Sequence, residues 1–571
     1  MECPRATSLP TLVDGVALMR ASTVGGGSSW DAVVIGAGHN GLVAAFTLAR
    51  AGLRTLVLER RSIVGGACVT EEFAPGYFAS SGAYVLSMLR PDVWRECRLV
   101  ERGLRVDSAG PTCNLGTDGT ALWLYDDPRQ AVREVARLSP NDARNLPRFQ
   151  DDLARLGRMV TPLIDQPPPD LTLGTWRELG GAARLARRML AGRRDVPDLL
   201  HLLTASVQQV LDERFESPAL KAALGWHAVN DSTQGPSSPG TGYVLLHDHA
   251  AAEAGGGVRQ WGFVRGGMGR VTALLAEAAR EAGAEIRTEA QVVRIVVAKG
   301  RVVGIELDDG STISAHLAVS NADPPHTFLT LLGPEDLPPS FVGAIRAYRC
   351  EGTSIKINCA LGALPQVVGF EGQGVQPIHR GVVEVLPSLE TLDWHQALAR
   401  RGEPASGTHI EFCFPTVHDP SLAPPGRHIV TIDVTAQPYR LGEGTWDGIK
   451  ERVADRVIHE MAAWMPELTS AIVAREVLSP VDLERRIGIT GGHALHGEMT
   501  LDQLFFLRPV AGWANYRTPI DGLYLCGAGT HPGGGVTGAN GRNAARQVLR
   551  DRRRQRHRTR RRERYEVVPP R

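Results

Sequence analysis

The sequence predicts an α/β protein in which a dinucleotide-binding Rossmann domain is interleaved with a second, α+β domain. Three observations predict this fold class: a G-x-G-x-x-G loop between a strand and a helix at residues 32–50, a long helical stretch after it, and a glycine-rich strand-turn-helix at residues 522–539. A chain of 571 residues is also too long for one compact core. We therefore expect two domains built from alternating segments.

The first predicted strand, Ala32–Ile35, runs into the loop Gly36-Ala37-Gly38-His39-Asn40-Gly41, and a helix follows at Leu42–Arg50. In such a loop the first glycine permits the tight turn, the second lets a pyrophosphate approach the backbone, and the third lets helix and strand pack closely. The start of the helix attracts the phosphate charge. This unit predicts a dinucleotide site.

A second strand, Arg54–Leu58, ends at Glu59, which stands 18 positions after Gly41. A carboxylate at this place can accept hydrogen bonds from the ribose hydroxyls. The following residues, Arg60 to Ala67, resemble the glutathione reductase-like FAD superfamily, in which an arginine and a Gly-Gly pair contact the dinucleotide. This resemblance implies FAD as the cofactor and assigns contacts to Arg60, Gly65, Gly66 and Ala67.

The third glycine-rich segment, Gly522 to Ala539, is expected to be a strand, a turn and a helix start that return the chain to the cofactor. Such a helix start can stabilise negative charge on the flavin ring. By resemblance to the superfamily, we expect flavin contacts at Gly527, Gly529, Gly535 and Val536, and an adenine contact from the backbone around Val292 and Val293. No second G-x-G-x-x-G follows a strand, which argues against a separate NAD(P)H domain.

The remaining elements complete a segmented domain plan. Helical spacing occurs at Ala131–Leu138, Asp151–Val160 and Leu199–Asp212, and short strands are expected at Glu285–Thr288, Gln291–Val297, Val302–Leu307 and Thr312–Val319. We expect a flexible leader at residues 1–30, FAD-binding segments at 31–100, 256–330 and 486–549, a helical substrate lobe at 101–255, a substrate domain at 331–485, and a disordered basic tail at 550–571.

Residues 31–546 as a whole resemble the phytoene desaturase-like branch of carotenoid oxidoreductases. The motifs that carry this resemblance are Val34–Ala45, Gly65–Ala67 with Thr70–Glu72, Leu89–Pro91, Gly242–His247, Gly266–Gly269, Leu501–Leu504 with Arg508-Pro509, and Gly529–Gly535. The resemblance implies an FAD-dependent oxidoreductase that transfers hydride between an organic, lipophilic substrate and the flavin. It does not supply the substrate.

Candidate catalytic residues are few, because the flavin performs the difficult chemistry in such enzymes. His531 beside the glycine-rich turn could act as an acid or base, or could pack the turn. Lys356 could face the flavin through a water, as in amine oxidases. The polar side chains of residues 354–359 share one face of a strand. That face could line a cavity beside the flavin or meet water, and we expect it to meet water. A second group of candidates precedes the turn: His493, His496, Glu498, Asp502 and Arg508.

Disulfide chemistry at the flavin is not expected. Flavin disulfide reductases place two cysteines in a C-x-x-x-x-C spacing after the Gly-Gly pair, and here Cys68 is followed by Phe73 at the second position. A lone cysteine cannot cycle as a dithiol, so Cys68 is interpreted as a small buried residue. The eight cysteines form no C-x-x-C pair and no metal-ligand spacing, which is typical of reduced thiols.

The formal net charge of +1 gives no general attraction to nucleic acid, so no nucleic-acid partner is expected. No stretch approaches the roughly 18 apolar residues that span a bilayer. The basic stretch 182–194 is an amphipathic candidate for peripheral membrane contact, or an ordinary exposed helix face. We expect a cytoplasmic location in a bacterium and the mitochondrial matrix in a eukaryote.

Three functions remain open. The first is a desaturase, dehydrogenase or isomerase that acts on a lipophilic substrate, with quinone or oxygen as the electron acceptor. The second is an amine oxidase-type flavoenzyme, which needs an aromatic cage at the ring. The third is a flavin-stabilised regulatory protein that binds a protein partner and has no turnover.

Overall fold

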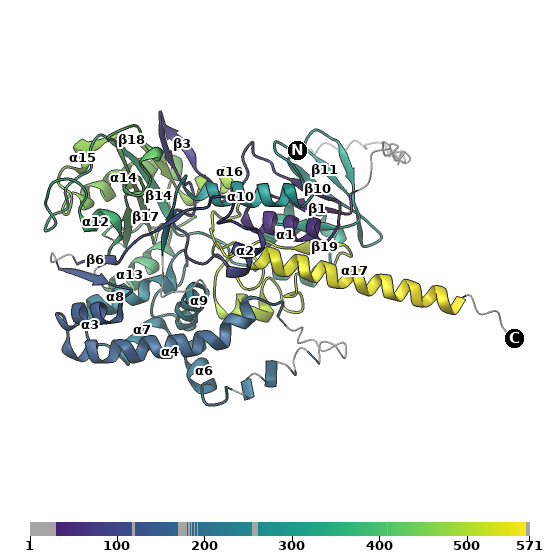
Figure 1. The fold of residues 1–571 in the computed structure, drawn as a ribbon, viewed down its shortest axis with the longest axis horizontal. Coiled ribbons are helices and arrows are strands. Elements are labelled where there is room, and N and C mark those ends of the chain that lie inside the picture. Colours follow the sequence, from purple (N-terminus) through teal and green to yellow (C-terminus); the bar gives the residue numbers. More distant parts are fainter. Residues whose placement is uncertain are drawn as a thin grey trace, which may run out of the picture.

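The computed structural model describes residues 30–116, 120–168, 192–253, 261–386, 388–407 and 409–566, with a few helical positions between 180 and 190. The expected leader before Trp30, part of the basic stretch 182–194 and residues 567–571 lie outside the described residues. Figure 1 shows a parallel sheet with its helices, a larger sheet beside it, and a helical lobe along one side of both.

Five parallel strands form the sheet that carries the glycine loop. Their order is β19 (Leu523–Leu525), β13 (Ala318–Ser320), β1 (Ala32–Ile35), β2 (Thr55–Leu58) and β9 (Glu285–Arg287). Parts of the chain that lie hundreds of positions apart thus become neighbours: β1 pairs with β13, and β13 pairs with β19. Strands covered on both faces need apolar side chains throughout, and every residue of β1 and β2 is buried.

Helices cover one face of this sheet and a small antiparallel sheet covers the other. The helices are α1 (His39–Arg50), α10 (Met268–Glu281) and α17 (Ala539–Glu566), which share one apolar core with β1 and β2. The antiparallel strands are β10 (Val292–Ala298), β11 (Arg301–Leu307) and β12 (Thr312–Ser314), which pack against Val33, Ile35 and Leu56. The strand expected at Thr312–Val319 is therefore two strands, β12 and β13, which belong to different sheets.

The C-terminal helix extends into the segment 550–571, where a disordered tail is expected, as far as Glu566. α17 continues to Glu566 and projects beyond the rest of the molecule (Figure 1, yellow). Its first turns are anchored because Ala544, Ala545 and Val548 are fully buried against α1. Once a helix is nucleated in this way, arginine extends it at little cost, since arginine is a good helix former.

The larger sheet has seven strands. Their order is β18 (Ile472–Leu478), β14 (Ile355–Leu361), β17 (His428–Val434), β16 (Ile410–Cys413), β15 (Val382–Val385), β6 (Thr112–Leu115) and β7 (Ala121–Leu124). One face is apolar and packs against α14 (Trp446–Met461). The other face carries polar side chains and lies toward the Rossmann part of the fold, which is the five-stranded sheet with helices α1, α10 and α17. The functional site lies between this polar face and the Rossmann part.

The helical lobe has its own apolar core. It comprises α3 (Pro128–Ala136), α4 (Pro140–Ile164), α6 (Val196–Thr204), α7 (Val207–Asp212), α8 (Pro218–Gly225) and α9 (Thr241–Glu253). The single helix expected at Leu199–Asp212 is broken, because the Ser206 side chain accepts a hydrogen bond from the Gln209 N–H and begins α7. Among the described residues, no helix is long and apolar enough to cross a membrane.

Shorter elements connect these parts. They are β3 (Glu71–Ala74), β4 (Tyr77–Ala79), α2 (Pro91–Glu96), β5 (Val106–Ser108), β8 (Gly262–Val264), α11 (Pro339–Arg346), α12 (Pro377–Arg380), α13 (Leu389–Ala399), α15 (Leu468–Ala471) and α16 (Pro480–Ile487).

Candidate functional site

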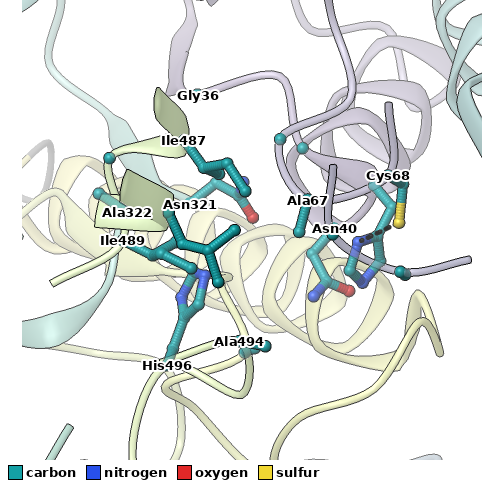
Figure 2. A pocket seen from close by; sticks show the side chains of 18 of the residues that line it. Gly36, Asn40, Ala67, Cys68, Asn321, Ala322, Ile487, Ile489, Ala494 and His496 are labelled. Carbon is teal, nitrogen blue, oxygen red and sulfur yellow. Dashed lines mark hydrogen bonds between the residues drawn. The ribbon is translucent and has the colours of Figure 1, made fainter. Parts of the chain in front are cut away.

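A cavity of about 330 Å³ runs from the glycine loop after β1 to the polar face of the seven-stranded sheet. At one end it is lined by Glu59 and Val292, and at the other by Lys356 and Asp433. Figure 2 shows its middle, where Asn321 and His496 lie on one side and Asn40 on the other. The cavity therefore lies where ligands bind in open parallel sheets, at the carboxyl ends of the strands.

The backbone conformation and packing of the loop glycines agree with the tight turn and the close approach of helix and strand that the sequence predicts. Gly36 has φ +91°, which side chains rarely adopt. A Cβ on Gly41 would lie 2.2 Å from the Gly36 carbonyl oxygen, so the start of α1 can approach β1 only without a side chain there. A Cβ on Gly38 would lie 2.7 Å from Asn321 Nδ2 and would face the cavity. The loop thus leaves its backbone open to a phosphate.

Glu59 is held in place by the loop. It is 6% exposed, and its two oxygens accept hydrogen bonds from the backbone N–H groups of Ala37, at 2.8 Å, and Arg61, at 3.0 Å. A carboxylate offers about four acceptor positions, so about two remain for the hydroxyls of a ribose. The cavity lining by Glu59 agrees with the role predicted for it.

Arg60 connects two distant segments at the same end of the cavity. Its guanidinium donates to the carbonyl oxygens of Arg485, at 3.1 Å, and Arg486, at 2.8 Å, at the end of α16. Burial lowers the pKa of Arg60 from its usual value. The side chain both lines the cavity and fixes the chain that returns to it after Gly488.

Most of the predicted cofactor residues meet at this cavity. Those that line it are Gly36, Gly38, His39, Asn40, Glu59, Arg60, Gly66, Ala67, Val292, Gly535 and Val536. The predicted residues outside the lining are Gly41, Gly65, Val293, Gly527 and Gly529. Their roles as direct contacts stay predictions, and the structure gives each of them a local function.

Three of these glycines are required by packing. A Cβ on Gly65 would lie 2.4 Å from the Cys68 carbonyl oxygen, one on Gly527 would lie 2.6 Å from the Asn321 carbonyl oxygen, and one on Gly529 would lie 2.3 Å from Pro324 Cδ. Val293 differs, because its side chain is 36% exposed and does not line the cavity. It lies at a β-bulge between Val292 and Arg294, where the extra residue leaves the hydrogen-bonding ladder.

His531 does not line the cavity, which corrects its choice as a catalytic candidate. Its Nε2 lies 2.8 Å from the Leu163 carbonyl oxygen at the end of α4, and its ring lies against Phe505 with centroids 6.3 Å apart. Burial lowers the pKa of His531 to about 4, so the ring is neutral at physiological pH. His531 therefore packs the glycine-rich turn against the helical lobe.

Of the second group of candidates, only His496 reaches the cavity. Burial lowers the pKa of His496 to about 4, and its Nδ1 has no hydrogen-bond partner among the described residues. Asp502 forms an exposed ion pair with Arg349 at 2.8 Å. Glu498 is buried and accepts hydrogen bonds from Ser232 and Thr233, at 2.6–2.8 Å.

The other two members of that group organise the backbone near the cavity. His493 Nδ1 lies 3.3 Å from Asp231 Oδ2, and although burial opposes it, the Asp231 carboxylate raises the pKa of His493. Arg508 is fully buried and donates to a group of carbonyl oxygens. These belong to Leu495, Gly497, Glu498, Gln503 and Ala528, at 2.8–3.2 Å. Arg508 thus holds the loop at 495–503 against the glycine-rich turn.

The polar face of β14 does not meet water, contrary to expectation. Lys356 is 3% exposed and lines the cavity, as does Ser354. The Lys356 Nζ donates to the Gly82 carbonyl oxygen at 2.6 Å and lies 3.9 Å from the centroid of the Tyr84 ring. Burial lowers the pKa of Lys356 to about 8. The face is buried because the chain around Gly82 and the Rossmann part cover it.

Sequence reasoning did not predict several other residues that line the cavity together with Lys356. They include Tyr84, Asn230, Asp231, Asn321 and Asp433. Burial raises the pKa of Asp433 to about 6, Lys356 opposes this rise, and Asp231 adds to it. The alternation of polar residues at Thr431, Asp433 and Thr435, along β17 and just beyond its end, was an available signal. It placed an acid on the same kind of polar strand face as Lys356.

Cys68 is a buried residue, as its isolation in the sequence indicates. It is 0% exposed, and burial raises its pKa to about 12, so it carries no thiolate at neutral pH. Its Sγ lies 3.7 Å from Nδ1 of His39 (Figure 2, dashed line). Burial lowers the pKa of His39 to about 4. The pair is therefore neutral and suited to packing beside an uncharged ring.

The cavity fits a flavin dinucleotide. Glycines without side chains expose the backbone at the start of α1, Glu59 keeps acceptor positions for a ribose, and the turn around Gly535 and Val536 supplies a second backbone surface before α17. These are the groups that a pyrophosphate, a ribose and a polar ring edge require.

The fold and the site define a dinucleotide-binding oxidoreductase. The family model described as flavin containing amine oxidoreductase matches residues 41–549. The chain belongs to this family and is an FAD-dependent oxidoreductase.

Named relatives cover nearly the whole chain. Pyridine nucleotide-disulfide oxidoreductase domain-containing protein 2 of Mus musculus is 40% identical over 91% of this chain and 94% of its own. A limonene dehydrogenase polypeptide of Castellaniella defragrans is 30% identical over 91% and 94%. A lycopene-forming phytoene desaturase of Paracoccus sp. is 27% identical over 91% and 97%. The expected resemblance to phytoene desaturases is confirmed.

Solved structures support the fold. The structure of wild-type putrescine oxidase bound to putrescine superposes with a TM-score of 0.58, at 16% identity, over 92% of this chain and 99% of that one. At this identity the likeness concerns the fold alone. The predicted α/β class with an FAD-binding Rossmann domain is confirmed.

Proposed function

We propose that this protein dehydrogenates an organic, lipophilic small molecule, with FAD as the hydride acceptor and Lys356 and Asp433 beside the reacting bond. One observation carries the proposal: a single cavity joins the dinucleotide loop of the Rossmann sheet to the buried Lys356 and the partly buried Asp433. When bound, FAD accepts a hydride. The chain's own task is to orient the substrate and to accept the proton that leaves with the hydride.

Lys356 and Asp433 suit proton transfer because their pKa values lie close together. Burial lowers the pKa of Lys356 to about 8 and raises that of Asp433 to about 6. A group that titrates near neutral pH can both accept and release a proton during turnover. Strand register places the two residues directly opposite each other, so both side chains lie on the same face of the sheet at this end of the cavity.

The relatives support a lipophilic substrate. The mouse, Castellaniella and Paracoccus proteins share almost the full length of the chain, and the names of the last two refer to limonene and phytoene. The amine oxidase alternative requires an aromatic cage. Among the described residues that line the cavity, Tyr84 is the only phenylalanine, tyrosine or tryptophan, and its ring already faces the Lys356 ammonium.

Absorption spectroscopy followed by anaerobic titration tests this proposal. Purified protein is expected to show flavin bands that NADH and NADPH do not bleach, and that terpenes or other lipophilic hydride donors do. Lys356→Met should slow bleaching and alter its pH dependence, whereas Lys221→Met, in an ion pair with Asp212 on the helical lobe, should not. Bleaching by amines alone, with release of peroxide, would favour the amine oxidase alternative.

Electron acceptor and location follow as parts of the same proposal. Quinone or oxygen would receive the electrons, and contact with a membrane surface or a protein partner would serve a quinone-linked enzyme. A bacterial protein would act in the cytoplasm and a eukaryotic one in the mitochondrial matrix. Mixing the reduced protein with oxygen or with a soluble quinone, and following the return of the flavin bands, would separate the two acceptors.

A further inference from the structure

A row of ionisable side chains crosses the cavity side of the seven-stranded sheet. Strand register places Lys356 opposite Asp433, Asp433 opposite Glu411, and Glu411 opposite Glu384. Residues directly opposite in antiparallel strands have Cβ atoms about 4.5–5.5 Å apart and share a face. The four side chains, named here the acid row, therefore form one line that begins in the cavity and continues beneath the helical lobe.

The acid row is buried too deeply to carry three negative charges. Glu411 is 1% exposed and Glu384 is 0% exposed. Like charges directly opposite each other in a sheet are destabilising, and a buried carboxylate without a cation takes up a proton instead. Lys356 supplies one positive charge for three carboxyl groups. At neutral pH the row consequently holds protons, and burial raises the pKa of Glu411 well above its usual value.

Unpartnered polar atoms surround the row. Neither oxygen of Glu411 has a hydrogen-bond partner among the described residues. His409, two positions earlier on the same strand face, is 1% exposed, and neither ring nitrogen has a hydrogen-bond partner in the described part of the chain. Buried polar groups are nearly always hydrogen-bonded, if not to protein then to water. Water between these groups would allow protons to move along the row.

The far end of the row approaches the surface. His227 Nε2 lies 3.6 Å from Glu384 Oε1, and the His227 side chain is 12% exposed. Trp226 lies between two histidine rings, with ring centroids 4.0 Å from both His227 and His409. The row thus joins the cavity at Lys356 to an imidazole that reaches solvent.

Other titratable groups face the row from each neighbouring element. They are Asp231 after the turn Trp226–Val229, Cys413 on β16 and Glu476 on β18. Cys113 on β6 pairs with Val383 and lies on the opposite, apolar face of the sheet. Burial keeps the Cys413 thiol protonated, because it raises the pKa of Cys413. Asp231 is already engaged by His493 and by backbone N–H groups. The carboxyl groups of the row remain the sites that can exchange protons.

We propose that the acid row is a proton store coupled to the redox state of the flavin. This proposal rests on the proposed function. Oxidation of the substrate breaks two C–H bonds: one hydrogen leaves as hydride, with both electrons, to the FAD, and the other leaves as a proton. Lys356 and Asp433 receive that proton, and a carboxylate of the row becomes a carboxylic acid. When the electrons pass to a quinone or oxygen, the row returns the proton.

The pH dependence of the flavin midpoint potential tests this store without any organic substrate. The potential is measured anaerobically against reference dyes across the range around pH 6, where Asp433 titrates. Its slope gives the number of protons bound per two electrons. The wild-type protein is expected to bind more than one proton, because the negative charge of the reduced ring draws a further proton onto the row. In Glu411→Gln the number should fall toward one.

Thr431→Val is the matched control. Thr431 lies on the same face of β17 as Asp433 and is 2% exposed. Its hydroxyl donates a hydrogen bond to Asn358 Oδ1 at 3.0 Å, so it belongs to the row of side chains next to the acid row. This variant should keep the wild-type slope. A slope of one proton in the wild-type protein, or an unchanged slope in Glu411→Gln, would overturn the proposal.

Infrared difference spectroscopy gives an independent measurement on the wild-type protein, for the case in which Glu411→Gln does not fold. Reduction should change the C=O stretch of a protonated carboxylic acid, and that band should shift in D2O. Its absence would also overturn the proposal. If both tests give the expected result but no organic compound reduces the flavin, the proton store is supported and the proposed function is refuted.

Discussion

Replacing Gly41 with alanine should weaken FAD binding by an amount that the loop geometry sets. A Cβ at this position would lie 2.2 Å from the Gly36 carbonyl oxygen, whereas real Cβ contacts essentially never fall below 3.0 Å. The oxygen belongs to the backbone and cannot rotate away as a side chain would. Either the oxygen or the start of α1 must therefore move by about 0.8 Å, the difference between these two distances.

Overpacking of this kind costs about 1–3 kcal/mol. The displaced groups are those predicted to hold the pyrophosphate, so most of the cost should appear in cofactor affinity. Since about 1.4 kcal/mol corresponds to a factor of ten, the Kd for FAD should rise between about fivefold and a hundredfold. Titration of the apoprotein with FAD, followed by quenching of flavin fluorescence, measures this change directly.

Gly343→Ala is the matched control for that titration. Gly343 lies inside α11, and nothing lies within 4 Å of a Cβ added there. Its replacement should leave the Kd for FAD unchanged, and alanine in a helix is about 1 kcal/mol more favourable than glycine. If Gly41→Ala binds FAD as tightly as Gly343→Ala does, the loop does not approach the cofactor as described.

Three further predictions follow from the site. Glu59→Gln should weaken FAD binding by about 1–3 kcal/mol in the same titration, because the amide must turn an N–H group toward a backbone donor or a ribose hydroxyl. If this variant binds FAD with the affinity of the wild-type protein, Glu59 does not have the predicted role. Arg508→Met should lower the free energy of unfolding by about 3 kcal/mol or more, since it leaves buried carbonyl oxygens without a donor. The release of flavin fluorescence on heating measures this, and Arg301→Met, in an exposed ion pair with Asp521, should show no change. Glu411→Gln should become more stable relative to the wild-type protein as the pH rises. Burial raises the pKa of Glu411 in the folded state, so the folded wild-type protein binds more protons than the unfolded protein. The wild-type protein therefore loses stability as the pH rises above the pKa of Glu411 in the unfolded state. If the thermal midpoints of the variant and the wild-type protein change in parallel from pH 5 to pH 8, Glu411 is not a buried acid.

The end of the cavity at the glycine loop could be predicted from the sequence, because local geometry determines it. A strand, a tight turn and a helix start within 20 residues can place a phosphate only one way, and the acid that ends the next strand lies beside it. The glycines at 36, 38 and 41 and the carboxylate of Glu59 are found where that pattern predicts. The boundaries of β1, β2 and α1 also agree with the prediction to within three residues.

The end of the cavity at Lys356 and Asp433 could not be predicted from the sequence, because it is assembled from residues far apart in the chain. His531 stands next to the flavin turn in sequence, yet its side chain turns toward α4. Lys356 stands on a strand whose polar face could equally have met water, and only the packing of the Rossmann part against that face buries it.

The sequence by itself determined the fold class and the cofactor, and it predicted the loop that should hold the cofactor phosphates, because each depends on spacing within one short unit. Tertiary structure decided which polar residues face the cavity and which acids lie opposite one another. The acid row shows the reason. Asp433, Glu411 and Glu384 lie on three different strands, and only the pairing register of β15, β16 and β17 brings their carboxyl groups into one buried line.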